Sequence, residues 1–166
     1  VAVLDGGLPA WEAEGFPLTS EVTDPPLPSS SFELAERPGM LADIDDVDAV
    51  RESQPTPVFD SRGPEGYHGQ GKYYDPVRGH IKGAGLADRA ETLTESGTFR
   101  SPVQLREHYD ILRAGRNPDE IIFYCGSGVT AAQNVLAMEH AGLPGARMYV
   151  GSWSEWILDP EREVEL

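Results

Sequence analysis

The single cysteine of this chain, Cys125, stands in a sequence suited to chemistry at sulfur. An apolar run at 121–124 predicts a buried strand before it, and Gly126-Ser127-Gly128 separates it from a helical pattern that begins at 129. A cysteine placed between a strand and a helix N-terminus lies among backbone N–H groups that lack intrahelical partners and stabilise negative charge. The two glycines allow successive N–H groups to turn inward around an anion. The pattern therefore predicts a thiolate nucleophile held by the backbone of its own loop.

Two other roles are open to a cysteine in such a loop. A lone cysteine is commonly a buried structural residue, but that role needs neither a pair of glycines nor a helix directly behind it. Cysteine-based phosphatases and arsenate reductases offer a second reading. The phosphatase loop carries an arginine six residues after the cysteine, which neutralises the phosphoryl group. Here that position is Ala131, so phosphate chemistry is disfavoured.

The histidines do not suggest a metal centre. His68, His80, His108 and His140 lack the spacing of metal ligands, and one cysteine cannot form a two-cysteine site or an internal disulfide. We therefore predict no metal and no cofactor. His80 lies in a glycine-rich turn, which favours a hydrogen-bonded structural role over that of a base.

Composition limits the partners of the protein. The 166 residues include 28 acidic and 13 basic ones, and the formal net charge of −15 disfavours both nucleic acid and anionic membranes as partners. No apolar run approaches the length of a membrane span, and no signal peptide opens the chain. A lone thiol suits a reducing compartment, so we expect a cytoplasmic protein. Strong acidity with only two lysines, Lys72 and Lys82, suggests a halophilic protein.

The segments around the loop alternate between strand and helix patterns. Short apolar runs at 57–60, 121–124 and 147–150 predict strands. Asp43 is suited to cap a helix over 43–53, and Ser101 begins a capping box with proline at the first helical position. This alternation predicts an α/β fold in which helices cover both faces of a parallel sheet. The helix at 129–141 is expected to bury Val129, Ala132, Val135 and Leu136.

A short internal repeat bears on domain organisation. Residues 5–11, DGGLPAW, align with residues 150–156, VGSWSEW, and each precedes or enters a predicted tryptophan helix. We interpret 1–19 as the end of an upstream domain of the same type, with a short strand, a Gly-Gly turn and a helix. The Pro- and Ser-rich residues 20–38 then form an extended linker, and 39–166 form the cysteine-bearing domain.

The sequence CGSGVTA at 125–131 resembles the active loop of 3-mercaptopyruvate sulfurtransferases, which are relatives of thiosulfate sulfurtransferase (rhodanese). Three further stretches fit this family. They are the strand-ending VFDSR at 58–62, the turn RGHIKGA at 78–84 with Lys82 in place of the usual proline, and GSWSEW at 151–156, matched by GGLPAW at 6–11. The resemblance implies a rhodanese-like three-layer fold, with a mostly parallel sheet of about five strands and helices on both faces.

The resemblance also implies a reaction in two steps. Cys125 would take a sulfur atom from a small anionic donor and carry it as a persulfide, which cyanide, a thiol or thioredoxin would then remove. The backbone of Gly126, Gly128, Val129 and Thr130 would hold that sulfur. Ser127 matches a loop serine that cooperates, in the mercaptopyruvate enzymes, with residues from an upstream domain of the same chain.

Two departures from the family pattern leave the donor open. The thiosulfate enzymes carry a lysine where this chain has Ser127, which argues against thiosulfate. The family also places a substrate-binding arginine where this chain has Gly66, so Arg62, Lys72 or Arg78 is expected to contact the anion instead. Arg62 could equally form a structural ion pair with Asp60. A carrier or regulatory module that holds a persulfide without turnover is the non-enzymatic alternative.

Overall fold

The computed structural model describes residues 2–21, 31, 33, 35, 37–70 and 75–166. A five-stranded sheet forms its centre, with the strand order β1 (Leu41–Ala42), β6 (Arg147–Tyr149), β5 (Ile122–Tyr124), β2 (Val58–Asp60) and β4 (Gly85–Leu86). All four neighbouring pairs are parallel. The predicted parallel sheet of about five strands is thereby confirmed.

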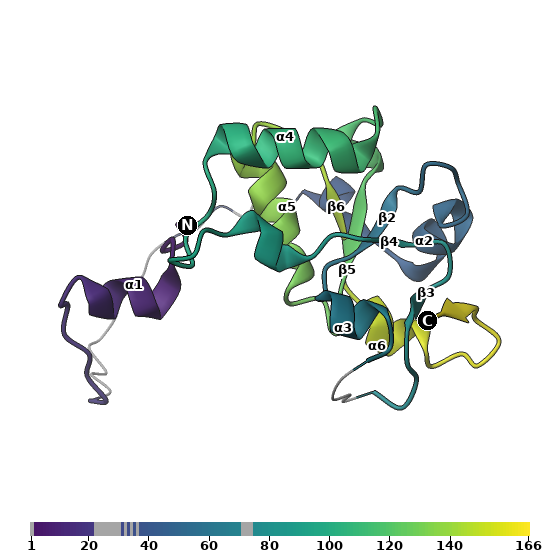
Figure 1. The fold of residues 1–166 in the computed structure, drawn as a ribbon, viewed down its shortest axis with the longest axis horizontal. Helices are drawn as coiled ribbons and strands as arrows, with labels where there is room; N and C mark the ends of the chain where they lie inside the picture. The colour runs from purple at the N-terminus through teal and green to yellow at the C-terminus, as the bar shows by residue number, and fades with distance from the viewer. Residues whose placement is uncertain (1, 22–30, 32, 34, 36, 71–74) are drawn as a thin grey trace.

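The helices form a layer on each face of this sheet (Figure 1). On one face, α4 (Pro102–Arg113) and α5 (Ala131–His140) pack on Phe59 and Phe123. On the other, α2 (Ile44–Val50) and α6 (Ser152–Trp156) pack on Val58 and Tyr124. Side chains on a strand alternate between faces, so each central strand contributes to two separate apolar clusters. The predicted three-layer α/β architecture is confirmed.

The shorter elements complete the chain. They are α1 (Gly7–Ala13), α3 (Pro64–Tyr67) and the 3₁₀ turns η1 (Pro38–Met40), η2 (Arg89–Thr92) and η3 (Pro118–Glu120). A second, antiparallel sheet pairs β3 (His80–Ile81) with β7 (Val164–Glu165). The C-terminal tail thus closes on the turn that precedes β4. Within the part of the chain that the structure describes, no helix is both long and apolar enough to cross a membrane.

Local sequence signals explain where several helices begin. Asp43 caps α2 by accepting hydrogen bonds from the N–H groups of Asp45 and Asp46, and Ser101 caps α4 in a capping box with Gln104. Both caps were predicted. They relieve the unpaired donors of the first helical turn and fix the positions at which these helices leave the sheet.

Two expectations about the chain are wrong. Residues 2–4 form no strand, because β-pairing needs a neighbouring strand and the described chain offers none there. The helix α5 begins at Ala131 rather than 129, and its buried face differs from the predicted one. Val135 is buried as expected, but Val129, Ala132 and Leu136 are exposed, and the inward positions are Ala131, Asn134, Val135, Ala137 and Met138. Most of the predicted linker, 20–38, lies outside the described residues.

Candidate active site

Cys125 comes directly after β5, at the carboxyl edge of the central strands. It is a free cysteine and only 2% exposed, and it packs in the same apolar cluster as Phe59 and Phe123. Burial of this kind is also typical of a structural cysteine. The loop after the cysteine, rather than its burial, distinguishes the two roles.

The loop 126–130 presents a row of unpaired hydrogen-bond donors. Among the described residues, no acceptor takes a hydrogen bond from the N–H groups of Gly126, Ser127, Gly128, Val129 or Thr130. Thr130, the N-cap of α5, makes no side-chain capping bond, and in the first turn of α5 the Gln133 N–H donates to the Thr130 carbonyl at 3.2 Å. Unpaired backbone donors at a helix N-terminus are suited to hold an anion. This loop can therefore stabilise a thiolate or a charged sulfur bound to it.

One glycine of the loop is required by its surroundings. Gly128 has a left-handed backbone (φ 81°), and a Cβ atom placed on it would lie 2.5 Å from the carbonyl oxygen of Val150. Gly126 has open space around it, and the side chains of Ser127 and Val129 are exposed. The loop thus packs tightly against the end of β6 at one residue and faces outward at its neighbours.

The N-terminus of α6 orients the first two peptides of the loop. The N–H of Trp153 donates to the Cys125 carbonyl at 3.0 Å, and the N–H of Ser154 donates to the Gly126 carbonyl at 2.9 Å. In a trans peptide the carbonyl and the next N–H point in opposite directions. The N–H groups of Gly126 and Ser127 are therefore turned away from α6. A packed helix thus decides which way these two donors point.

Arg62 and Asp60 form the predicted ion pair at the end of β2. The Arg62 guanidinium contacts the Asp60 carboxylate at 2.6 Å, donates to the Gly79 carbonyl at 2.6 Å, and lies 4.9 Å above the Trp153 ring. Burial alone would lower the pKa of Arg62, but the hydrogen bonds to Asp60 and the negative charges near the guanidinium, first that of Asp60, together outweigh it and hold the pKa above its ordinary value. These contacts occupy the guanidinium and fix the strand end to the turn at Gly79. Direct contact between Arg62 and a donor anion stays a prediction.

A buried polar network supports the site from the α4 and α5 side. The Asn134 amide donates to the Ser61 hydroxyl and to the Ala87 carbonyl, both at 2.9 Å, and its oxygen accepts from the Tyr109 hydroxyl at 2.7 Å. Asn134, Ser61 and Tyr109 are fully buried. A buried amide whose hydrogen bonds are satisfied fixes the relative positions of the segments it joins. Here it ties α5, whose N-terminus faces the loop, to the end of β2.

The other candidate residues lie apart from this cluster of donors. His80 stacks on Tyr67 at 3.6 Å, and its Nδ1 lies 2.9 Å from the Tyr67 carbonyl, consistent with a structural role. Burial lowers the pKa of His80. Arg78 precedes the β3 turn, and Lys72 lies outside the described residues. Within the described part of the chain, no group of three or more His, Cys, Asp or Glu side chains is arranged to hold a metal ion.

Sequence reasoning missed two residues that shape the site. Ser152 accepts a hydrogen bond from the Cys125 N–H at 3.2 Å, although it is 27 residues away in the chain. Asn134 is in the helix after the loop, where a polar residue among apolar ones signals a buried partner. The signal for Ser152 was its position within the GSWSEW motif, which is both part of the internal repeat and a family signature.

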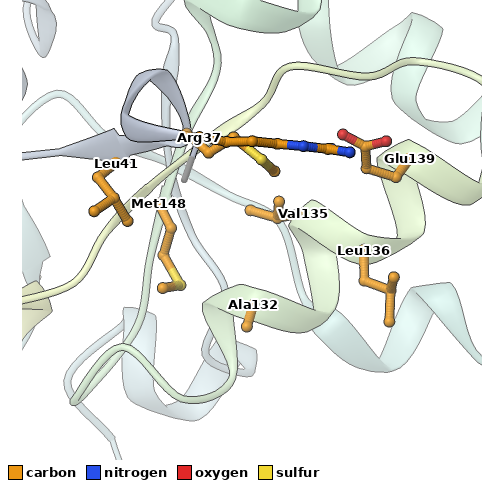
Figure 2. Close-up of a pocket in the computed structure, with 8 residues that line it drawn as sticks. Arg37, Leu41, Ala132, Val135, Leu136, Glu139 and Met148 are labelled. Carbon is orange, nitrogen blue, oxygen red and sulfur yellow. The ribbon is translucent and has the colours of Figure 1, made fainter. Parts of the chain in front are cut away.

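An apolar groove lies on the outer side of α5 and is separate from the cysteine loop. It has a volume of about 440 Å³. Figure 2 shows Val135 of α5 pointing toward Met148, with Leu41 beyond it, and Ala132 and Leu136 also line the groove. Arg37 extends along one edge toward Glu139. Neither Cys125 nor the described loop residues line this groove. It offers an apolar surface for packing rather than a site for chemistry.

The sequence matches the model of one protein family and is similar to sulfurtransferases. A family model described as a rhodanese-like domain matches residues 43–159. The chain is 40% identical to a probable 3-mercaptopyruvate sulfurtransferase of Pseudomonas aeruginosa, over 99% of this chain and 57% of that protein. It is 33% identical to the thiosulfate sulfurtransferase of Rattus norvegicus, over 99% of this chain and 56% of that protein. This chain thus spans little more than half the length of these curated relatives.

Solved structures of EanB resemble the fold of this chain over nearly its whole length. Wild-type EanB superimposes with a TM-score of 0.79 at 25% identity, over 98% of this chain and 40% of that one. A structure of an EanB variant that carries a cysteine persulfide and ergothioneine gives the same TM-score, identity and coverage.

Proposed function

The chain belongs to the rhodanese-like domain family, and we propose that it is the cysteine-bearing half of a sulfurtransferase in which Cys125 carries sulfur as a persulfide. The observation that carries the proposal is the set of unpaired N–H groups from Gly126 to Thr130 beside Cys125. A structural cysteine needs no such donors. A negatively charged sulfur does, because the donors replace the water that would otherwise solvate it.

The proposed reaction passes one sulfur atom through Cys125. The Cys125 thiolate attacks the sulfane sulfur of the donor, so that a new S–S bond forms on the enzyme. The old bond to that sulfur breaks, and its electron pair leaves with pyruvate, as the enolate, or with sulfite. An acceptor such as cyanide, a thiol or thioredoxin then attacks the outer sulfur and restores the thiolate. The exposed face of the loop, at Ser127 and Val129, is the side from which we propose that the acceptor approaches.

We propose 3-mercaptopyruvate rather than thiosulfate as the donor. The support is Ser127, which is exposed beside Cys125 at the position where thiosulfate enzymes carry a lysine. The 40% identity to a probable 3-mercaptopyruvate sulfurtransferase agrees with this choice. The identities to thiosulfate enzymes are 33%, and that to the 3-mercaptopyruvate sulfurtransferase of Homo sapiens is 29%, so Ser127 rather than overall identity carries this choice. We further propose that the reaction takes place in the cytoplasm, where an unpaired thiol stays reduced.

An upstream domain of the same type is the proposed partner within the full protein. The turns at Gly6 and Gly151 share one feature, because the residue after each glycine, Gly7 or Ser152, has a left-handed φ, of 59° and 54°. The glycines themselves differ, with φ of 82° at Gly6 and −61° at Gly151. Large apolar side chains around α1 are exposed in this chain, namely Val3, Leu4, Leu8, Phe16 and Leu18. Together with the groove on α5, they provide the apolar surface that such a domain would cover.

A persulfide carrier without turnover remains a second candidate. The observation in its favour is that Asp60 and Gly79 already engage the Nε and Nη2 atoms of Arg62, which leaves less of the guanidinium for a donor anion. Steady-state formation of thiocyanate from a donor and cyanide distinguishes the two. An enzyme forms many equivalents of thiocyanate per Cys125, and a carrier forms only one.

The first test is the intact mass of the chain after incubation with 3-mercaptopyruvate or thiosulfate, before and after cyanide. We expect the gain of one sulfur atom, faster with 3-mercaptopyruvate, and its removal by cyanide. Cys125→Ser is the control and should gain nothing. A natively folded chain that gains no sulfur from either donor would contradict the proposal.

A further inference from the structure

Ser152 has a backbone conformation that is unfavourable for its residue type. Its φ angle is 54°, and among the described residues only Ala114 shares a positive φ without being glycine. A side chain in the left-handed region has its Cβ too close to the following carbonyl. Ser152 is also fully buried, so its hydroxyl has to find its hydrogen-bond partners within the protein. A strained, buried serine directs attention to what its hydroxyl contributes.

The Ser152 hydroxyl joins the end of β6 to the candidate nucleophile. It donates to the Tyr149 carbonyl at 2.8 Å and accepts from the Cys125 N–H at 3.2 Å. The next two N–H groups in the chain, those of Trp153 and Ser154, hold the carbonyls of Cys125 and Gly126. The left-handed turn at Ser152 therefore places residues 152–154 against Cys125 and Gly126.

The residue that is equivalent to Ser152 in the internal repeat shows which side chain the backbone conformation of the turn requires. It is Gly7, with a φ of 59°, close to the value at Ser152. Glycine adopts this conformation without strain. The turn can thus be made by glycine where no cysteine lies beside it, and serine adds only its side chain.

We propose that Ser152 is a positioning residue for Cys125, whose hydroxyl holds the Cys125 backbone so that the thiol meets its sulfur donor in one fixed geometry. The kinetic consequence rests on the proposed sulfurtransferase function, but the positioning itself does not. The hydroxyl accepts the hydrogen bond from the Cys125 N–H. The hydrogen bonds from α6 turn the N–H groups of Gly126 and Ser127 away from that helix. Without the hydroxyl, the Cys125 N–H loses its buried acceptor and the thiol is free to shift.

The variant Ser152→Gly separates positioning from folding, because it keeps the left-handed turn and removes the side chain that carries the hydroxyl. We expect it to melt within about 4 °C of the native chain, since relief of backbone strain offsets the lost hydrogen bonds. The maximal rate of persulfide formation should fall about tenfold or more, with the donor concentration at half-maximal rate unchanged within about twofold. Ser152→Ala, which keeps the Cβ atom, should lose as much rate and more stability.

Gly7→Ser is the matched control, because it places a serine at nearly the same φ away from Cys125. It should leave the rate of persulfide formation unchanged. A folded Ser152→Gly chain that reacts at the native rate would overturn the proposal.

Amide hydrogen exchange in the native chain tests the same inference without a variant. The Cys125 N–H should exchange slowly, whereas the N–H groups of Gly126 and Ser127 should exchange fast. Rapid exchange at Cys125 would overturn the proposal even if every Ser152 variant fails to fold.

The test also separates this proposal from the proposed function. If the native chain forms no persulfide, the proposed function fails, and the alkylation rate of Cys125 by iodoacetamide replaces the kinetic readout. A change of about tenfold between the native chain and Ser152→Gly then supports positioning. Equal alkylation rates contradict it.

Discussion

Two turns in this chain share a sequence pattern and a left-handed residue at the same position, yet their surroundings differ. The turn at 5–11 ends in Trp11, which is 36% exposed, and the turn at 150–156 ends in Trp156, which is fully buried. At the left-handed position, the first turn has Gly7 and the second has Ser152. In Figure 1 the helix α1 after the first turn stands apart from the body, whereas α6 lies within it.

The difference shows that one local pattern serves two purposes. The first turn makes a hydrogen bond to the body of the domain, from the Phe99 N–H to the Asp5 carboxylate at 2.8 Å. The second turn holds Cys125 through its backbone and through the Ser152 hydroxyl. The shared sequence determines the turn, and packing decides whether that turn acts on a neighbouring loop.

The largest expected contrast concerns the two tryptophans. Trp156 lies under the guanidinium of Arg162 at 4.7 Å and donates to the Glu163 carbonyl at 3.2 Å. Trp156→Ala should reduce the free energy of unfolding by about 3–5 kcal/mol, because it leaves a large cavity in the core. Trp11 packs against Phe16, at 4.6 Å, and Trp11→Ala should cost less than about 1 kcal/mol. Urea denaturation of this 166-residue chain measures both, and equal losses would show that the two turns are equally integrated.

Local signals in the sequence predicted much of this architecture. The caps at Asp43 and Ser101, the strand before Cys125 and the glycines after it involve residues close together in the chain. Their physics is local, so the pattern alone identifies them.

Long-range contacts account for the features that the sequence could not predict. Ser152 reaches Cys125 across 27 residues, and Asn134 reaches Ser61 across 73. The residues next to Ser152 or Asn134 in the sequence do not specify these partners. The buried face of α5 was missed for a related reason, because its packing against α4, β5 and β6 decides which side of the helix faces the core, and the pattern of 129–141 alone does not identify that side. Periodicity likewise cannot show whether a strand predicted at 2–4 has a neighbouring strand to pair with.

The second contrast uses two glycines in left-handed conformations. Gly128, at 81°, packs against the carbonyl of Val150, the first residue of the second turn, whereas Gly7, at 59°, has no atom nearer than 3.9 Å to an added Cβ. Gly128→Ala should destabilise the chain by roughly 2–3 kcal/mol, because both the backbone conformation and the clash oppose it. It should also abolish persulfide formation.

Gly7→Ala should cost only the conformational strain, about 1 kcal/mol. Because α1 makes few contacts with the body, this loss should appear as an increase of about fivefold in amide exchange within α1, with global unfolding unchanged. A fall in global stability as large as that of Gly128→Ala would mean that the first turn is as firmly packed as the second.

The smallest expected effect concerns the C-terminal tail, which extends beyond the second turn. After Trp156 the chain returns as β7 to pair with β3, and His80 of β3 lies 3.8 Å from the Glu165 carboxylate. Burial lowers the pKa of His80, and Asp60 and Glu165 only partly offset it. The folded state therefore prefers the neutral ring, and the stability due to His80 is full above its ordinary pKa of 6.5 and is lost as the pH falls through the lowered value.

Chemical denaturation between about pH 7.5 and pH 5 should show this decline in stability, smaller than the loss in Trp156→Ala. The decline should shrink in His80→Gln, although a part due to His108, whose pKa burial also lowers, should remain. An unchanged decline would mean that the pairing of β3 with β7 does not depend on the charge of His80, and that the tail after the second turn is held by its backbone alone.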